Sequence, residues 1–176
     1  MKGVILTKDN LKKCNWNGDD GCCFCNNKET IQHLFFDCHV ASFVWRIVLV
    51  AFGLTPPSNV SCFVSTWFEQ VDSNMRPLLC VGVSAIVWSI WMCRNYCIFD
   101  RKRLYSYLQV IFRGTYWIRF WSLLQKEDGR NHLKWACRLL ETVAFEVFAK
   151  NGWLSSRRLC VWDYLFIICF FFKNLL

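Results

Sequence analysis

Apolar residues dominate the chain after residue 38, and glycine and proline interrupt them at intervals that predict successive helices. The segment 39–52 is apolar almost throughout, and Gly53 followed by Pro56-Pro57 ends it, because proline disfavours helix at the residue before it. Pro77 suits the first turn of a further, long helix. Asn151-Gly152 predicts a left-handed end to the last helix. The predicted helices cover residues 39–52, 59–71, 77–99, 104–125 and 131–150.

The predicted helix over 104–125 interleaves aromatic and basic side chains. Such a pattern can stack on nucleic-acid bases while neutralising phosphates, as in proteins that bind single strands. However, Ile111, Phe112, Tyr116 and Ile118 fall at helical spacings that bury one stripe of a helix. We therefore expect most of these rings to belong to the core.

Two apolar segments raise the question of a membrane. The uncharged stretch 77–93, between Arg76 and Arg94, has 17 residues, whereas a spanning helix needs about 20. Two serines and two tryptophans dilute it further, and we interpret it as a central buried helix. The tail 161–172 is intensely apolar but too short for a confident span. We therefore expect no membrane partner, and membrane association is kept as the alternative.

Composition and charge narrow the class of protein. The chain has 176 residues, enough for one sizeable core or for a small module plus a helical domain. It has 12 cysteines but no apolar signal segment at its beginning, which predicts reduced thiols and a nuclear or cytoplasmic, intracellular location. Its net charge of +8 favours contact with phosphate backbones or acidic surfaces. The basic residues are scattered, so we expect each single cluster to be a solvated face.

Close to the start of the chain lie four candidate zinc ligands, Cys22, Cys25, His33 and Cys38. Three thiolates and an imidazole would complete the tetrahedral shell of a structural zinc site, which leaves no open position for water activation. The bland alternative is a set of ordinary buried cysteines. The choice of ligands is also ambiguous, because other candidates lie beside or upstream of these residues, namely Cys14, Cys23 and His39.

The spacing of the last two candidates limits the local structure. Residues five apart on an ideal helix point about 140° away from each other, so His33 and Cys38 cannot face one ion from one regular helix. We therefore predict a short helical turn over 30–36, a break around Asp37 and a new helix just after Cys38. Thr30 or Glu29 suits the start of the turn, since short polar side chains cap amide groups and acidic ones favour the positive helix end.

Catalytic constellations are not evident in the sequence. The aspartate pair Asp19-Asp20 lies among turn-forming residues and lacks the apolar strands that would flank a two-metal polymerase site. There is no glycine-rich phosphate loop and no nucleophile elbow. Of the remaining histidines, His39 is an alternative ligand, and His132 falls among polar residues of a predicted helix surface. We therefore expect a protein that is not an enzyme.

Several runs of residues resemble one family. They are Ile5 to Leu11, Cys22-Cys-Phe-Cys25, Glu29 to Cys38, and Trp88-Ser-Ile-Trp91-Met-Cys-Arg94-Asn95. Together they are similar to the zinc-binding domain that follows the reverse transcriptase in plant non-LTR (LINE-type) retrotransposons. The resemblance implies a structural Zn²⁺ on Cys22, Cys25, His33 and Cys38. It also implies a C-terminal fragment of a longer polyprotein, which helps the parent reverse transcriptase region engage RNA or DNA.

The expected architecture is mainly α, with a small zinc-stabilised Cys-Cys-His-Cys module followed by a helical, bundle-like region. We predict a module with its following helix over 1–55, a helical region over 56–153, and an apolar tail over 154–176 outside the fold. The leading functional hypothesis is a noncatalytic structural zinc-binding domain. The alternatives are a small membrane-associated protein, which uses 77–93 or the tail, and a transposon remnant without selected function.

Overall fold

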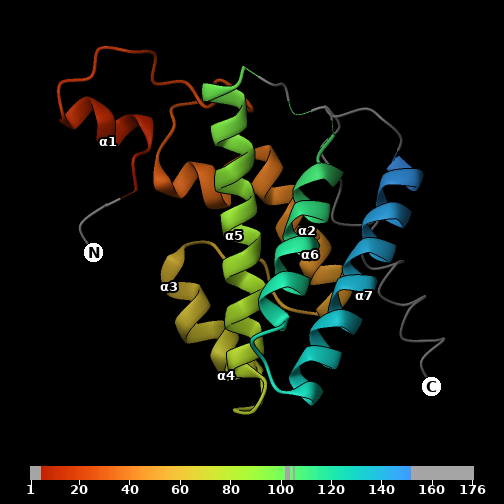
Figure 1. Ribbon diagram of the computed structural model, residues 1–176. Helices are drawn as coiled ribbons and strands as arrows, with labels where there is room; N and C mark the ends of the chain where they lie inside the picture. The colour runs from red at the N-terminus through yellow and green to blue at the C-terminus, as the bar shows by residue number, and fades with distance from the viewer. Residues whose placement is uncertain (1–4, 102–103, 105, 152–176) are drawn as a thin grey trace.

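The computed structural model describes residues 5–101, 104 and 106–151, and helices dominate this part of the chain (Figure 1). The predicted mainly α class is confirmed. The described segments contain no strand, only an isolated antiparallel bridge between Gly21 and Lys28. The elements are α1 (Lys8–Lys13), the π-helical turn η1 (His33–Asp37), α2 (His39–Phe52), α3 (Val60–Cys62), the π-helical turn η2 (Phe63–Trp67), α4 (Phe68–Gln70), α5 (Arg76–Phe99), α6 (Leu108–Ser122) and α7 (Glu127–Asn151).

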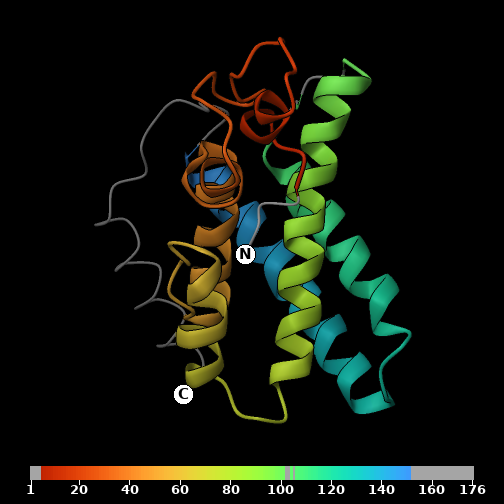
Figure 2. The same cartoon turned by 90° about the vertical axis from the view of Figure 1, so that its left-hand side faces the viewer.

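Four of these helices form a bundle. The helices α5, α6 and α7 run alternately up and down beside one another, and α2 packs against α7 (Figures 1 and 2). The short N-terminal elements lie at the end of the bundle where α5 ends (Figure 2). The bundle-like region of the sequence prediction is therefore present, and the candidate ligands lie at its end.

Helix α2 has the boundaries that its sequence predicts. It begins directly after Cys38, whose backbone is extended, and it ends at Gly53, whose φ of 69° is the left-handed conformation that glycine adopts without strain. One face is buried, and Trp45 is its largest side chain. The Trp45 indole N–H donates to the carbonyl oxygen of Phe35 at 2.7 Å. This contact joins the helix to η1.

Helix α5 is apolar, but it is buried along one face only. It contains Pro77 in its first turn, as predicted, and it presents Ala85, Ile86, Ser89 and Ile90 to the interior. By length and composition it could cross a membrane, and 28% of its most apolar window is buried. The prediction of a central buried helix therefore holds for the stripe that packs on α6.

The exposure of α6 differs from the sequence prediction. Ile111 and Ile118 are buried as expected, whereas Phe112 and Tyr116 are exposed, so the expectation that these rings are core is wrong. The reason is geometric, because α6 packs against α5 and α7 and keeps its remaining face toward solvent. Helix α6 is also shorter than the predicted range 104–125.

Helix α7 begins at Glu127, four residues before the predicted start at Asn131. Glu127 and Asp128 lie in its first turn, where acidic side chains interact favourably with the helix dipole. Its predicted terminator, Gly152, lies outside the described residues. The early start lengthens the surface on which α6 packs.

Candidate metal centre

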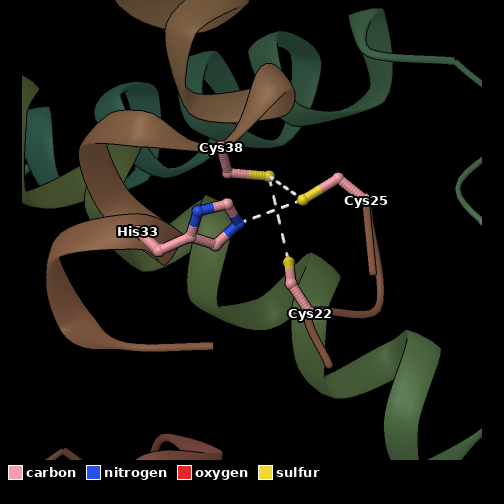
Figure 3. A group of neighbouring side chains, drawn as sticks. All are labelled: Cys22, Cys25, His33 and Cys38. Atoms are coloured by element: carbon pink, nitrogen blue, oxygen red, sulfur yellow. Dashed lines mark hydrogen bonds between the residues drawn. The ribbon is translucent and has the colours of Figure 1, made fainter. Parts of the chain in front are cut away.

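A tight hairpin presents the first two candidate ligands. The backbone N–H of Cys22 donates to Asn27 O at 2.6 Å, and that of Asn26 donates to Cys22 O at 2.9 Å. Asn26 has a positive φ of 62°, which asparagine tolerates better than most residues. The sulfurs of Cys22 and Cys25 therefore point toward the same space (Figure 3). The N–H of Phe24 also donates to Cys22 Sγ at 3.5 Å, and such a contact favours negative charge on the sulfur.

His33 is the first residue of the π-helical turn η1, and Cys38 directly follows its last residue. The Cys38 N–H donates to His33 O at 2.7 Å, which is the hydrogen bond between residues five apart that defines a π-helix. In an α-helix these side chains would point apart, whereas the wider turn brings residues five apart to one face. The predicted helical turn is thus present, but its break is at Cys38 and not at Asp37, because the wide turn includes Asp37.

Thr30 and Glu29 are both predicted for the start of this turn, and they have different roles. The hydroxyl oxygen of Thr30 accepts the His33 N–H at 3.0 Å, so the predicted cap is confirmed for Thr30. Glu29 has another role. Its side chain is fully buried, and its carboxylate accepts the backbone N–H of Lys8 at 2.9 Å.

The ligand atoms of Cys22, Cys25, His33 and Cys38 lie within 4.8 Å of one another (Figure 3). Cys38 Sγ is 3.9 Å from both Cys22 Sγ and Cys25 Sγ. Two thiolates at the usual Zn–S distance in a tetrahedral shell are about 3.8 Å apart, so these sulfurs already fit. His33 Nε2 lies 3.0 Å from Cys25 Sγ, which is shorter than the corresponding edge of about 3.5 Å. An outward shift of the imidazole of about half an ångström would bring this pair to the tetrahedral separation.

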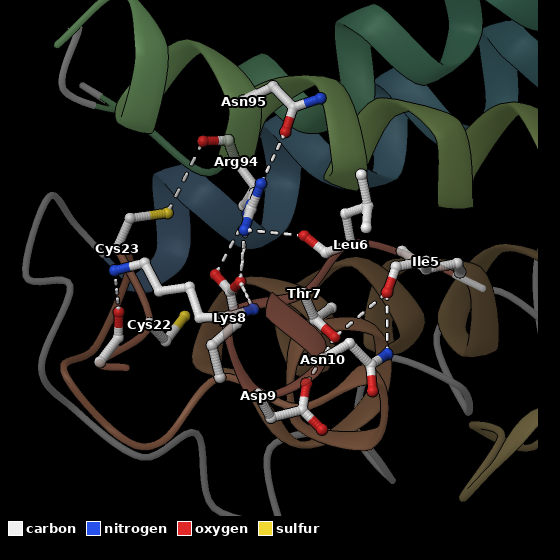
Figure 4. A network of polar contacts seen from close by, with 12 residues as sticks. Ile5, Leu6, Thr7, Lys8, Asp9, Asn10, Cys22, Cys23, Arg94 and Asn95 are labelled. Carbon is white, nitrogen blue, oxygen red and sulfur yellow. Dashed lines mark hydrogen bonds and ion pairs between the residues drawn. The ribbon is translucent and has the colours of Figure 1, made fainter. Parts of the chain in front are cut away.

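The other candidate ligands do not join this group. Cys23 Sγ points toward the carbonyl oxygen of Arg94 at 3.9 Å (Figure 4). Cys14 and His39 are exposed. Within the described part of the chain, the group of converging ligand atoms therefore excludes these neighbours, although the Cys23 thiol is close enough to hydrogen-bond with Cys22.

The three cysteine thiols of the group differ in the direction of their pKa shifts. The pKa of Cys22 is lowered well below its ordinary range, first by a hydrogen bond from Cys23 and then by one from Cys38. The pKa of Cys38 is raised, mainly by its hydrogen bond to Cys22, and that of Cys25 is raised mainly by burial. The protein alone thus favours one thiolate among three sulfurs. A divalent cation would stabilise the negative charge of all three cysteines as thiolates. Three sulfurs and one imidazole nitrogen are a donor set that suits zinc.

A buried ion pair between Glu29 and Arg94 connects the candidate metal centre to the bundle; Arg94 is labelled in Figure 4. Arg94 is 2% exposed, and its Nη2 lies 2.6 Å from Glu29 Oε1, while its Nε donates to both carboxylate oxygens at 3.2 Å. The guanidinium also donates to Leu6 O at 3.3 Å and to Asn95 Oδ1 at 3.0 Å. The sequence analysis missed this pair. Its signal was that Arg94 is the only charged residue between Arg76 and Asp100, since a charge in an apolar helix needs a partner.

Three lysines of this region are paired with acids. Three ion pairs link Lys8 to Asp19 at 3.1 Å, Lys12 to Asp20 at 2.9 Å and Lys13 to Asp9 at 3.8 Å. The two aspartates that the sequence analysis tested as a catalytic pair therefore face lysines. The pKa of Asp19 is lowered mainly by a backbone hydrogen bond from Gly21, and that of Asp20 mainly by Lys12.

Comparison with known proteins identifies one similarity. Residues 1–45 match the family described as zinc-binding in reverse transcriptase. The matched segment includes the hairpin, η1 and all four converging residues, and it ends inside α2. The matched family is a zinc-binding domain and not the catalytic domain of the polymerase. No curated protein and no solved structure matches the chain.

Proposed function

We propose that Cys22, Cys25, His33 and Cys38 bind one structural zinc ion in a noncatalytic domain of a reverse transcriptase polyprotein. The observation that carries the proposal is the convergence of three sulfurs and one imidazole nitrogen within 4.8 Å. The family match over residues 1–45 supports it independently. Four protein ligands fill a tetrahedral shell, so the ion would hold the fold and would not activate water.

The zinc ion would fasten the hairpin to the first turn of α2. The hairpin that carries Cys22 and Cys25 is held by short backbone hydrogen bonds, and α2 begins directly after Cys38. An ion shared by these cysteines would cross-link the hairpin to the start of α2. Because such a site does not exist in the unfolded chain, the free energy of metal binding would become free energy of folding.

In this proposal the domain helps the parent polymerase to engage RNA or DNA. The net charge of +8 supports contact with phosphates. The reduced thiols that zinc needs support a location inside the cell, in the nucleus or the cytoplasm. Phosphate-driven binding should weaken steeply as salt rises. A filter-binding assay across salt concentrations tests this part, and binding that is absent or independent of salt would remove it.

Metal quantification on the purified full chain tests the zinc site. We expect about one zinc per chain, and we expect Cys22→Ser and Cys38→Ser to lose it, because each removes one of four ligands. Two matched controls are available, since Cys23 and His39 are direct neighbours of these cysteines and lie outside the group. Cys23→Ser and His39→Gln should retain zinc. Loss of zinc in the controls, or its retention in both ligand variants, would overturn the assignment.

One observation favours a second candidate, a membrane-associated protein. Helix α5 is long and apolar enough to cross a bilayer. Against this, one stripe of α5 packs on α6, and Arg94 near its end forms a buried ion pair with Glu29. Flotation of the full chain with lipid vesicles distinguishes the two candidate functions. Stable, salt-resistant flotation would favour the membrane candidate, and recovery in the soluble fraction would favour the zinc domain.

A further inference from the structure

Helices α5 and α6 expose a group of aromatic rings on one face. Trp117 is the centre of the group, and its ring contacts four others. Three of them have centroid distances of 5.4 to 6.4 Å and nearly perpendicular planes, and the fourth, the half-buried Trp121, lies tilted at 5.8 Å. The outer rings remain accessible, with exposed fractions of 40% for Trp88, 60% for Tyr116 and 53% for Phe120. We call these residues the aromatic platform, and its members are Trp88, Tyr116, Trp117 and Phe120.

The two helices that carry the aromatic platform have only basic charged residues. Helices α5 and α6 contain no acidic residue, and Arg113 is exposed one turn before Trp117. The guanidinium of Arg113 lies over the ring of Tyr96 on α5, 4.3 Å from its centroid. The acid that faces α6 from α7 is Glu141, and Arg119 pairs with it at 2.7 Å. An anionic partner would therefore meet a cation beside the rings. No carboxylate on α5 or α6 would repel it.

We propose that the aromatic platform and Arg113 bind single-stranded nucleic acid. This inference deepens the proposed function, because it rests on the domain's engagement of RNA or DNA and assigns a surface to it. Bases can stack on exposed aromatic rings whatever their sequence, and a neighbouring arginine can neutralise a phosphate. Tyr116 and Phe120 are four residues apart on α6, so their rings recur about 6 Å apart along the helix axis. A duplex hides the faces of its bases and would not gain these contacts.

The alternatives explain the surface less well. Rings that served only to fill the core would be buried, as Ile111 and Ile118 of the same helix are. A face that is aromatic, accessible and free of acidic residues is typical of a binding surface. Lipid is the other class of partner that such a face could meet, and the experiment below separates it from nucleic acid.

Fluorescence anisotropy with the full chain tests the proposal. The probes are labelled oligouridine and oligothymidine of equal length, and the competitors are the unlabelled single strands, an unlabelled duplex and anionic phosphatidylserine vesicles. Tyr116→Ala and Phe120→Ala should each weaken binding of the single strands by about 5- to 150-fold, which corresponds to one lost stacked base. Tyr116→Phe keeps the ring and should retain binding.

The control is Trp135→Ala on α7. Trp135 is as exposed as Tyr116, at 59%, but it contacts Phe52 on α2 and lies outside the aromatic platform. We expect its loss to leave binding unchanged, and circular dichroism checks that all variants fold. Equal weakening in the control, unchanged affinity in both alanine variants, or competition by vesicles but not by unlabelled single strands would overturn the proposal.

Zinc content separates the failure of this inference from that of the proposed function. The aromatic platform lies on the bundle, away from the four candidate ligands, so its variants should keep one zinc per chain. Binding that depends on Tyr116 in a protein without zinc would refute the metal site and leave the aromatic platform standing. A protein with one zinc whose affinity is unaffected by Tyr116→Ala and Phe120→Ala would refute the aromatic platform alone.

Discussion

Substitution of Glu29 by glutamine removes one charge from the buried ion pair that joins the segment with the candidate ligands to α5. Glu29 is fully buried, and its oxygens accept hydrogen bonds from Arg94 and from the backbone of Lys8. Glutamine has nearly the same shape but presents an NH₂ group in place of one carboxylate oxygen. Arg94 would then keep its charge, at 2% exposure, without a compensating anion. The substitution therefore tests charge pairing and not packing.

The expected cost is large for one substitution. Removal of one partner from a buried ion pair destabilises proteins by about 3–5 kcal/mol, because the remaining charge stays desolvated. The total stability of a domain is only about 5–15 kcal/mol. For a chain of this length, a loss of that size lowers the melting temperature by roughly 6–20 °C. Glu29→Gln should therefore unfold far more readily than the unmutated protein.

Urea unfolding followed by tryptophan fluorescence measures the effect. Free zinc must be buffered at one concentration, because a bound ligand shifts apparent stability. The matched control is Lys12→Gln, which breaks the exposed pair with Asp20 and should leave the unfolding midpoint nearly unchanged. Replacement of both partners, Glu29→Leu with Arg94→Met, should recover part of the loss. A Glu29→Gln protein within about 1 kcal/mol of the unmutated one would refute this reasoning.

Three further predictions concern the helices. The pKa of Glu141 is lowered from 4.5, chiefly by its hydrogen bond from Arg119, so this pair stabilises the fold above pH 4.5 and loses its effect as the pH falls through the lower folded-state value. In acid titrations followed by circular dichroism, Glu141→Gln should flatten the decline in that range, and an unchanged profile would contradict the pairing. Ile90→Ala should cost about 2–5 kcal/mol in urea unfolding, since Ile90 is fully buried, and a much smaller loss would argue against that burial. Gly53→Val should cost roughly 1–2 kcal/mol, because the space around Gly53 is open but its φ is left-handed, and an unchanged melting temperature would exclude that conformation.

Local sequence signals predicted the ends of the helices well. Gly53 ends α2 and Pro77 lies in the first turn of α5, because both residues restrict the backbone whatever surrounds them. Thr30 caps its turn for a similarly local reason. The break predicted around Asp37 falls at Cys38, and α2 begins just after Cys38 as predicted. A π-helical turn leaves no mark in spacing rules that assume a regular α-helix.

Features that depend on contacts distant in sequence were beyond local patterns. Tyr116 shares a helix with buried Ile118, and only the placement of α5 and α7 decides which of the two faces solvent. The partner of Arg94 lies 65 residues earlier in the chain, at Glu29. The spacing of the four candidate ligands suggested a cluster but could not exclude Cys23. Its separation from them follows from the direction of the hairpin, which turns its side chain toward α5.

X-ray absorption at the zinc edge, measured on the purified full chain, tests the central claim most directly. We predict a four-coordinate shell with three sulfurs at about 2.3 Å and one nitrogen at about 2.0 Å. That result would match the three cysteines and one histidine that converge at the end of the bundle. A shell that contains water or carboxylate oxygens, a different number of sulfurs, or a protein that binds no zinc would contradict it.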